Sequence, residues 1–368
     1  MGVNKTKKNG MKGGNDINGK EKYDDRGFCA ALYKKGVTKR SESNDVTDFC
    51  PMISKATVAW IDYVVDDFEK ESLSIAQSLG FSELLAKNMI KCTGSGYEDF
   101  LNEVGILLPA MRVDGFEVDL DPLLIFIKKN AIVTIHSKET KRFFRVRRYA
   151  ETLLRKFPKK TKQNDKITIL LARIIDENNA RNFDHLREIE EQGDRMSRDL
   201  SDPKTPRQVL GPKIYQMKHA LIVYLGGLWS TVDALNSIRY GDADLLTDDH
   251  RILDRISGLL GEVHSQIGLA EHLSEVLASG LEVLQSIYNN QLQVLNNRLA
   301  MLAAYLAIIS TALLVPNTIA TIASNSMFGF TSGDITWYLS VLIISAVLGT
   351  IATWAILKKS GLLPSTPD

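Results

Sequence analysis

The sequence has few of the residues that build metal centres or disulfides. Its 368 residues include three cysteines, Cys29, Cys50 and Cys92, with no CxxC spacing and no neighbouring histidines. So few thiols suit a reducing compartment and argue against a structural zinc site. Walker A, GxSxG and HExxH motifs are absent, and the six histidines are scattered. We therefore predict neither an enzyme nor a protein with a resident cofactor.

The sequence also has no excess of charge of either sign. It contains 45 Lys and Arg residues against 44 Asp and Glu. Nucleic-acid binding proteins and proteins that attract acidic substrates usually carry a strong charge bias. We therefore expect no nucleic-acid partner. The first apolar run long enough for a signal peptide lies near the C-terminus, so we expect no N-terminal signal.

The N-terminal part divides into a polar stretch and a mixed α/β pattern. Residues 1–48 are rich in Gly, Asn, Lys and Asp, which predicts a disordered tail. Short apolar runs follow and predict strands. The expected strands are 56–64, 105–111, 122–127 and 130–136, the last two forming a hairpin. A basic amphipathic helix is expected at Arg142–Phe157, and we interpret its cations, including Arg147, as a solvated face rather than a ligand surface.

Long helical patterns dominate the rest of the chain. Two of them, at 165–200 and 207–240, flank a proline-containing break at 201–206. The first is so highly charged that we expect it on the outside. A third begins with Thr247 or Asp248 as its N-cap and continues into an uncharged run from Leu299 to Ala323. At about 1.5 Å per residue, that run is long enough to cross a bilayer.

A second apolar span ends at Lys358 and Lys359, which places the C-terminus in the cytosol. Two spans return the N-terminal domain to the same side, so we expect a multi-pass protein of the cell membrane with both termini cytoplasmic. The predicted order is a polar tail (1–48), a cytosolic α/β domain (49–163), a charged helical hairpin (164–246), a stalk helix (247–298), a first span that lines a pore (299–325), an external loop (326–336), a second span (337–357) and a basic tail (358–368).

One face of the long helix is polar through the stalk and the membrane. At 100° per residue, the residues of this polar stripe are all polar or small except Leu314. The candidate pore-lining members are Asn289, Gln293, Asn296, Thr311, Leu314, Thr318, Thr321 and Asn325. Unpaired polar groups are costly in hydrocarbon, so the stripe must face protein or water. Close helix packing explains its small residues, but a water-filled pore between symmetry-related copies also explains why the polarity continues through the stalk.

An acidic cluster lies at the turn into the stalk, around Asp242, Asp244, Asp248, Asp249 and Asp254. Asp248 and Asp249 are candidate ligands for a regulatory divalent cation held between subunits. Helix capping and compensation of the helix dipole explain the same residues, and we favour that interpretation.

The order of these parts resembles the CorA family of divalent-cation channels. Local sequences match as well: GYEDFL at Gly96–Leu101 resembles the entry to the family's central strands, LIFIKKNAIVTIH at Leu124–His136 resembles its hairpin, and NNRLAML at Asn296–Leu302 stands at the entry to the first span. The resemblance implies an α/β domain, a helical hairpin and a stalk helix that continues into the first span. It also implies a funnel of five copies.

Two family features are missing. The Gly-Met-Asn signature at the outer end of the first span is replaced by ASNSMFG at Ala323–Gly329. The acidic pair of the family's cytosolic regulatory metal site aligns with Lys87-Asn88, which cannot supply two carboxylates. The resemblance implies a homopentamer in membrane lipid that conducts a divalent cation, most simply Mg²⁺. The alternatives are a family member for Zn²⁺, Co²⁺ or Ni²⁺, and a membrane-anchored sensor or scaffold that does not conduct.

Overall fold

The computed structural model describes residues 26–34, 36–158, 160–201, 210–241, 243–323, 333 and 335–359. The chain forms two compact units, residues 1–279 and 280–368. Helix α8, His250–Ala323, contributes to both. Asn325, Asp242 and most of the predicted external loop lie outside the described residues.

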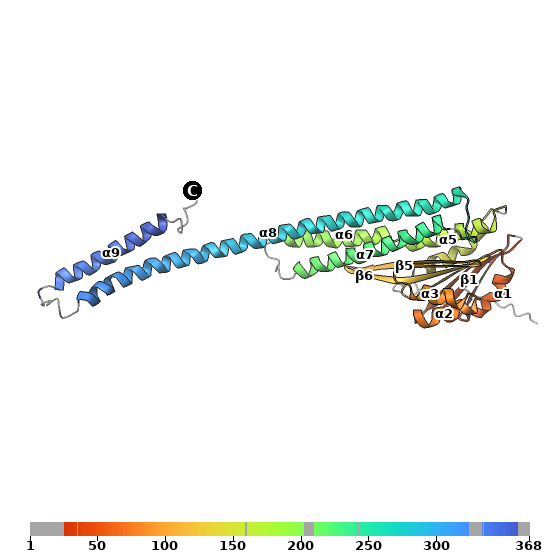
Figure 1. Cartoon of the computed structure of the whole chain (residues 1–368), viewed down its shortest axis with the longest axis horizontal. Helices are drawn as coiled ribbons and strands as arrows, with labels where there is room; N and C mark the ends of the chain where they lie inside the picture. The colour runs from red at the N-terminus through yellow and green to blue at the C-terminus, as the bar shows by residue number, and fades with distance from the viewer. Residues whose placement is uncertain are drawn as a thin grey trace, which may run out of the picture. The chain divides into compact units, whose positions relative to one another are not determined.

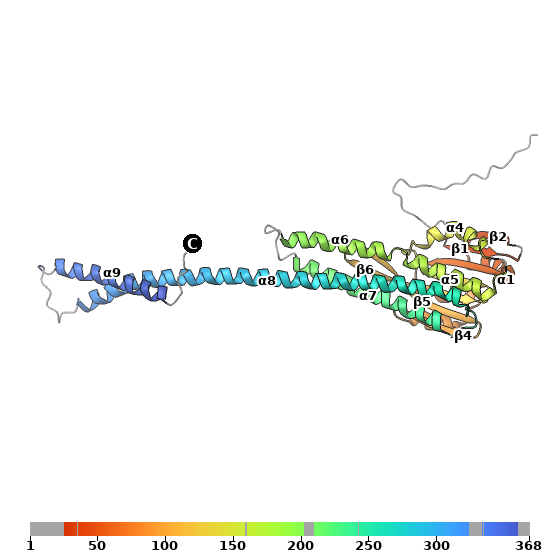
Figure 2. The ribbon, with the colours of Figure 1, turned by 90° about the horizontal axis from the view of Figure 1, so that it is seen from above.

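The first unit is built on a seven-stranded mixed sheet. Its strands are β1 (Gly27–Leu32), β2 (Thr38–Ser43), β3 (Val58–Val65), β4 (Gly96–Phe100), β5 (Glu103–Asp114), β6 (Glu117–Lys128) and β7 (Ala131–Ser137). Their order is β2-β1-β3-β7-β6-β5-β4, with β2 and β4 at opposite edges (Figure 2). The central pair β3 and β7 is parallel and the other neighbours are antiparallel. The predicted hairpin at Lys128-Lys129-Asn130 joins β6 to β7.

The prediction of a disordered tail over residues 1–48 is wrong for residues 26–48. Strands β1 and β2 lie there, followed by the 3₁₀ helix η1 at Val46–Phe49. All six residues of β1 are buried, because β1 is paired on both sides, by β2 and by β3. Strand β2, with the sequence TKRSES, is the polar edge of the sheet. Its composition is typical of a loop, and only its pairing with β1 makes it a strand.

Helices cover the two faces of the sheet as separate layers (Figure 1). One layer contains α1 (Cys50–Lys55), α2 (Phe68–Ser78) and α3 (Glu83–Lys91). The other contains α4 (Phe143–Arg155), α5 (Gln163–Asn179), α6 (Asn182–Ser201) and α7 (Leu210–Tyr240). The core on the first side includes Ile61, Val133 and Phe126 from the strands and Leu85 and Met89 from α3.

Two glycines let helices approach the sheet closely from both sides. A Cβ at Gly105 of β5 would lie 2.7 Å from Met89 Cγ of α3. A Cβ at Gly227 of α7 would lie 2.8 Å from Leu120 Cδ2 and 3.0 Å from Met111 Sδ. Atoms in protein interiors are close-packed, so each larger side chain would displace a neighbour.

The helical pattern at 165–200 is two helices rather than one. Helix α5 ends at Asn179 and α6 begins at Asn182. Asparagine amides bond to neighbouring segments at this junction: Asn178 Nδ2 donates to the Pro109 carbonyl (3.0 Å) and Asn182 Nδ2 to Gln266 Oε1 (3.1 Å). The charged α6 is not wholly on the outside, because Leu186, Ile189 and Met196 are buried. These three buried side chains, separated by three and then seven residues, form a narrow inner stripe.

Three helices in the described chain are long and apolar enough to cross a membrane, namely α7, α8 and α9 (Ile335–Lys359). Half of the most apolar stretch of α7 is buried inside the first unit, where the helix packs against β5, β6 and α6. Its apolar character is therefore that of a core helix. The most apolar stretches of α8 and α9 are 6% and 0% buried, so these two helices have no protein core to explain their composition.

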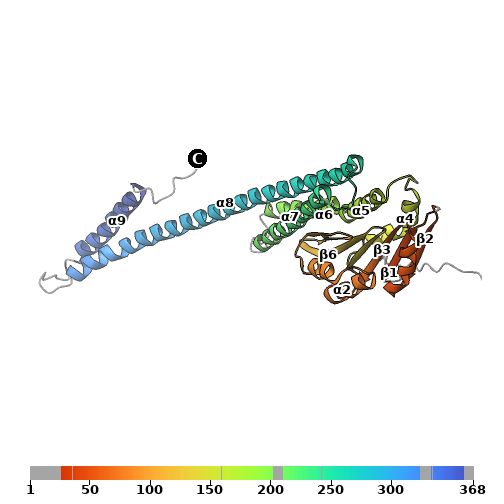
Figure 3. The same ribbon diagram turned by 45° about the vertical axis from the view of Figure 1, so that its right-hand side comes forward.

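In the second unit, α9 turns back along the last part of α8 (Figure 3). Gly349 of α9 lies against Val315 and Thr311 of α8, where an added Cβ would be 3.4 Å from Val315 Cγ2 and 3.6 Å from Thr311 Cγ2. Tyr338 Oη of α9 donates a hydrogen bond of 3.4 Å to the Ala320 carbonyl. A small residue at a helix contact is typical of packing within membranes. Helix α8 continues through Pro316 without a break.

Gly227→Val should destabilise the first unit by about 1–3 kcal/mol, because the new side chain overlaps Leu120 and Met111. Gly226→Val is the matched control, since a Cβ at Gly226 meets nothing within 4 Å. Thermal unfolding of the full-length protein in detergent measures both variants. Equal melting temperatures for the two would contradict the close approach of α7 to the sheet.

Candidate functional site

The threonines of the polar stripe bond to their own helix. Thr311 Oγ1 donates to the Ala307 carbonyl (2.9 Å), Thr318 Oγ1 to the Leu314 carbonyl (2.8 Å) and Thr321 Oγ1 to the Asn317 carbonyl (2.8 Å). Each hydroxyl proton is thus directed one turn back along the helix. A hydroxyl that donates to its own helix can still accept a hydrogen bond, and Thr318 is placed on the exposed face where it can do so.

Helix α9 covers only part of the stripe on α8. Thr318 and Thr321 are exposed in the single chain, and Leu314 is 59% exposed. Thr311 is half-buried, because it lies at the edge of the stripe against Gly349 of α9. The structure therefore leaves most of the membrane part of the stripe open for a second chain or for water.

Towards the stalk, the polar stripe remains uncovered. Asn289, Gln293 and Asn296 are all exposed on α8. The outermost candidate, Asn325, lies outside the described residues, so its place beyond Ala323 stays a prediction. The three described threonines and the three amides lie on one continuous helix.

Of the two candidate metal residues at the start of α8, Asp249 acts as the helix cap. Asp249 Oδ1 accepts the backbone N–H of Arg251 (3.0 Å), and the Asp249 carbonyl accepts those of Ile252 and Leu253. Asp249 is therefore the cap, rather than Thr247 or Asp248 as predicted. The hydrogen bond from the Arg251 N–H lowers the pKa of Asp249. Among the described residues, no three His, Cys, Asp or Glu side chains form a group that could hold a metal. A site shared between subunits stays a prediction.

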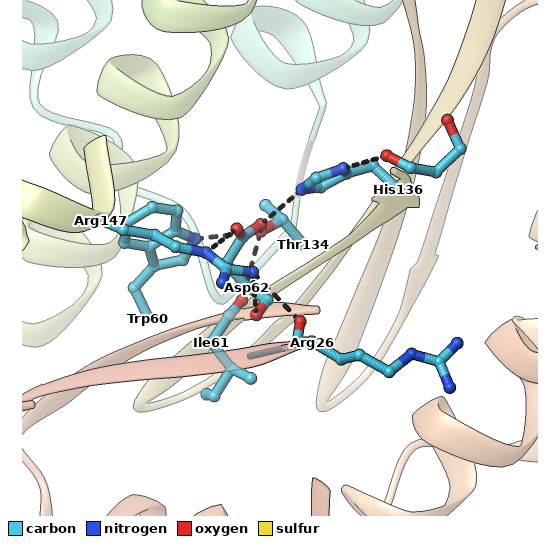
Figure 4. A network of polar contacts seen from close by, with 8 residues as sticks. Arg26, Trp60, Ile61, Asp62, Thr134, His136 and Arg147 are labelled. Atoms are coloured by element: carbon cyan, nitrogen blue, oxygen red, sulfur yellow. Dashed lines mark hydrogen bonds and ion pairs between the residues drawn. The ribbon is translucent and has the colours of Figure 1, made fainter. Parts of the chain in front are cut away.

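A buried charge network lies between the central strands and α4 (Figure 4). The carboxylate of Asp62, on β3, is 0% exposed. Arg147 Nε of α4 donates to its Oδ2 (2.7 Å), Thr134 Oγ1 of β7 donates to its Oδ1 (2.5 Å), and His136 Nε2 lies 3.1 Å from Oδ1. Because β3 and β7 are paired with Asp62 opposite Thr134 and Val64 opposite His136, strand register brings these groups together.

Further hydrogen bonds complete the network. Arg147 Nη2 donates to the carbonyls of Arg26 (3.2 Å) and Asp62 (3.1 Å). His136 Nδ1 lies 2.8 Å from the Ser137 carbonyl, so each ring nitrogen faces an oxygen atom. Burial by itself would raise the pKa of Asp62. The charges of His136 and Arg147 and the hydrogen bonds from His136 and Thr134 outweigh burial and hold this pKa well below its usual range.

The sequence pattern did not predict this network. Arg147 was interpreted as part of a solvated helix face, yet its side chain is 8% exposed and bonded to Asp62. The available signal was Asp62 itself, a single carboxylate inside the apolar run AWIDYVV. A charge in a buried strand requires a partner. Nothing local identifies that partner, since Arg147 is 85 residues away in the sequence.

Comparison with known proteins identifies the family. A family model described as the CorA-like Mg²⁺ transporter protein matches residues 55–359. The chain belongs to this family. The predicted CorA resemblance is thus confirmed, and so is the arrangement of an N-terminal α/β domain followed by long helices. No curated protein sequence matches this CorA-family chain significantly.

Solved structures show the same fold. The complete CorA magnesium transporter from Methanocaldococcus jannaschii is 18% identical, with a TM-score of 0.64 over 92% of this chain and 98% of that one. The full-length CmaX protein is 15% identical, with a TM-score of 0.55 over 92% and 99% of the two chains. At these identities the likeness concerns the fold alone. CorA-family proteins are membrane proteins, which agrees with the uncovered apolar helices α8 and α9.

Asp62→Asn should destabilise the first unit by about 3–5 kcal/mol, because it leaves the Arg147 guanidinium buried without its counter-ion. The free energy of opening can be measured from hydrogen exchange of the β3 and β7 amides in the full-length protein. Asp66→Asn is the control. Its carboxylate is 61% exposed and pairs with Arg26 and Lys138, so a loss of less than about 1 kcal/mol is expected. Equal losses would contradict a special role for Asp62.

The contribution of Asp62 should also depend on pH. A carboxyl group with a lowered folded-state pKa contributes stability above its unfolded pKa, near 3.9, and loses it as pH falls toward the folded value. The difference between wild type and Asp62→Asn should therefore be constant from pH 5 to 8. At pH 3 it should be smaller by about 1 kcal/mol. A difference that grows as pH falls would show that the pKa of Asp62 is raised instead.

Proposed function

We propose that the protein is a channel or transporter that lets divalent metal cations cross a membrane passively, with Mg²⁺ as its ion. The family of the chain supports cation transport. A subunit with two membrane spans cannot enclose a pore alone, so the proposal requires a symmetric homo-oligomer. Five copies, as the resemblance to CorA implies, would line the pore with α8 and face membrane lipid with α9. The proposal includes no enzymatic reaction.

The observation that carries this proposal is the direction of the threonine hydroxyls. Mg²⁺ releases its waters reluctantly, and the hydrogens of those waters point away from the ion. A pore that passes the hydrated ion therefore needs acceptors on its wall. Thr318 lies on the exposed face and donates its proton to the Leu314 carbonyl of α8, so its oxygen can accept a hydrogen bond from the water around the ion. Thr321 lies three residues further along the same exposed face. Rings of these oxygens would hold the hydrated ion weakly enough to let it move on.

The composition of the span favours a hard cation. From Leu299 to Ala323 the helix contains no His, Cys, Asp or Glu. Zn²⁺, Co²⁺ and Ni²⁺ prefer imidazole and thiolate ligands, whereas Mg²⁺ prefers neutral and anionic oxygen. Because the Gly-Met-Asn signature is missing, Zn²⁺, Co²⁺ and Ni²⁺ stay as alternative ions. Asn325 would then supply the outermost ring of amides, and Leu314 a hydrophobic constriction.

The proposal includes a membrane topology with both termini in the cytoplasm. Lys358 and Lys359 follow α9, which supports a cytoplasmic C-terminus. Two antiparallel spans would return the α/β unit to the cytoplasm of a cell membrane. The first unit would then meet the cytosolic ion concentration, and the Asp248 and Asp249 turn would be available for a cation shared between subunits.

Flux into proteoliposomes tests the stripe. The double variant Thr318→Val, Thr321→Val keeps the shape of both side chains and removes their hydroxyl oxygens. Because every copy in the oligomer loses both oxygens, Mg²⁺ flux should fall at least about tenfold. Thr353→Val is the control, because Thr353 Oγ1 makes the same backward bond to the Gly349 carbonyl (2.9 Å) but belongs to α9 and not to the stripe of α8. Wild-type flux from the double variant would contradict the role of these threonines.

Asn325→Leu tests the outer ring in the same assay, with Mg²⁺, Co²⁺, Ni²⁺ and Zn²⁺ compared side by side. We expect this variant to abolish the flux and the wild type to favour Mg²⁺. Faster Zn²⁺, Co²⁺ or Ni²⁺ flux in the wild type would assign one of those ions instead. No flux of any of the four ions, from protein shown to be an intact oligomer, would leave the sensor or scaffold as the function.

A further inference from the structure

A groove of 490 Å³ lies in the first unit where α6, α7 and the turn between β5 and β6 meet. The far end of the β5–β6 hairpin lies beside α6 and α7 (Figure 1). Three cations line the groove, namely Arg195 and Arg198 of α6 and Lys213 of α7. Neither the polar stripe nor the proposed cation transport accounts for this groove.

The walls of the groove are held in place by the backbone. Gly115 takes a φ of +62°, which suits the first position of the two-residue turn between Asp114 and Glu117. Its N–H donates to Glu188 Oε1 of α6 (3.1 Å), which ties the turn to that helix. The next residue, Phe116, is half-buried and lines the groove. Met196, 5% exposed, adds a second apolar side chain.

The cations of the groove are only weakly paired. Lys213 Nζ lies 3.7 Å from Asp199 Oδ2, and Arg195 Nη2 lies 4.0 Å from Glu191 Oε2. Both pairs are exposed and long, and such pairs hold their partners weakly. Arg198 makes no ion pair with any residue that the structure describes. Asp199 is the one acid among the lining residues, against three cations, so the groove has a net positive charge.

We propose that this groove binds a nucleoside polyphosphate. Arginine presents a planar fork of donors that matches phosphate oxygens, and lysine adds a point charge. Phe116 offers an aromatic surface for a base. Gln192 and Gln216, also in the lining, carry both donors and acceptors and can bond the edge of a base or a ribose hydroxyl. The lining has no nucleophile or phosphate-binding loop, so the proposal is binding without hydrolysis.

Calorimetry on the full-length protein in detergent, with EDTA present, tests the proposal with ATP as the probe. ATP should bind, and Arg198→Gln with Lys213→Gln should weaken its binding at least about tenfold. Arg187→Gln is the matched control, because Arg187 is an exposed arginine of α6 outside the groove, and it should bind ATP as the wild type does. Far-UV circular dichroism should show the same helix content in all three proteins.

Inorganic tripolyphosphate separates the phosphate contacts from the base contacts. Phe116→Leu should weaken ATP binding severalfold and leave tripolyphosphate binding unchanged. Tripolyphosphate that binds as tightly as ATP in the wild type would overturn the nucleoside assignment. No ATP binding at millimolar concentration, or equal weakening by the control variant, would overturn the site. The measurement requires no ion flux, so its failure is distinct from failure of the transport proposal.

Discussion

Hydrocarbon offers no hydrogen-bond partner, and this constraint governs the second unit. Helix α8 carries threonines through an uncharged, mostly apolar span, and the three described threonine hydroxyls donate back to the helix at 2.8–2.9 Å. Because each hydroxyl is bonded to a carbonyl of its own helix, these threonines can lie in the span without a donor partner elsewhere. Helix α9 leaves Thr318 and Thr321 exposed in the single chain. The proposed assembly around a pore depends on this exposed polar face.

The first unit satisfies its polar groups by a different route. Asp62 is fully buried in the centre of the sheet, where a single charge would be very costly. Parallel pairing of β3 with β7 supplies Thr134 and His136, and α4 supplies Arg147. The same arginine also bonds the carbonyl of Arg26, at the start of the described chain. One carboxylate thus joins the central strands, a covering helix and the N-terminal strand, and this specific pairing favours one register and one position for α4.

Local sequence patterns predicted much of this fold, because the spacing of apolar residues depends on which face of each strand or helix is buried. Alternating apolar runs indicated β5, β6 and β7, and the uncharged run to Ala323 indicated a membrane helix. The errors have physical causes too. Strand β2 is polar throughout, because an edge strand needs only a partner, not an apolar sequence. The α5–α6 junction was missed because the partners of its asparagines, Pro109 for Asn178 and Gln266 for Asn182, are distant in the sequence.

The sequence by itself indicated the family, two apolar helices long enough to cross a membrane, and the polar stripe, because length, composition and periodicity along one helix need no knowledge of its neighbours. Tertiary structure alone decided which part of that stripe stays open, since this depends on where Gly349 brings α9 against Thr311. It also decided that Arg147 is a buried partner rather than a solvated cation, and that Asp249 caps α8. Each of these outcomes is set by distances between residues far apart in the chain, and such distances exist only once the chain has folded.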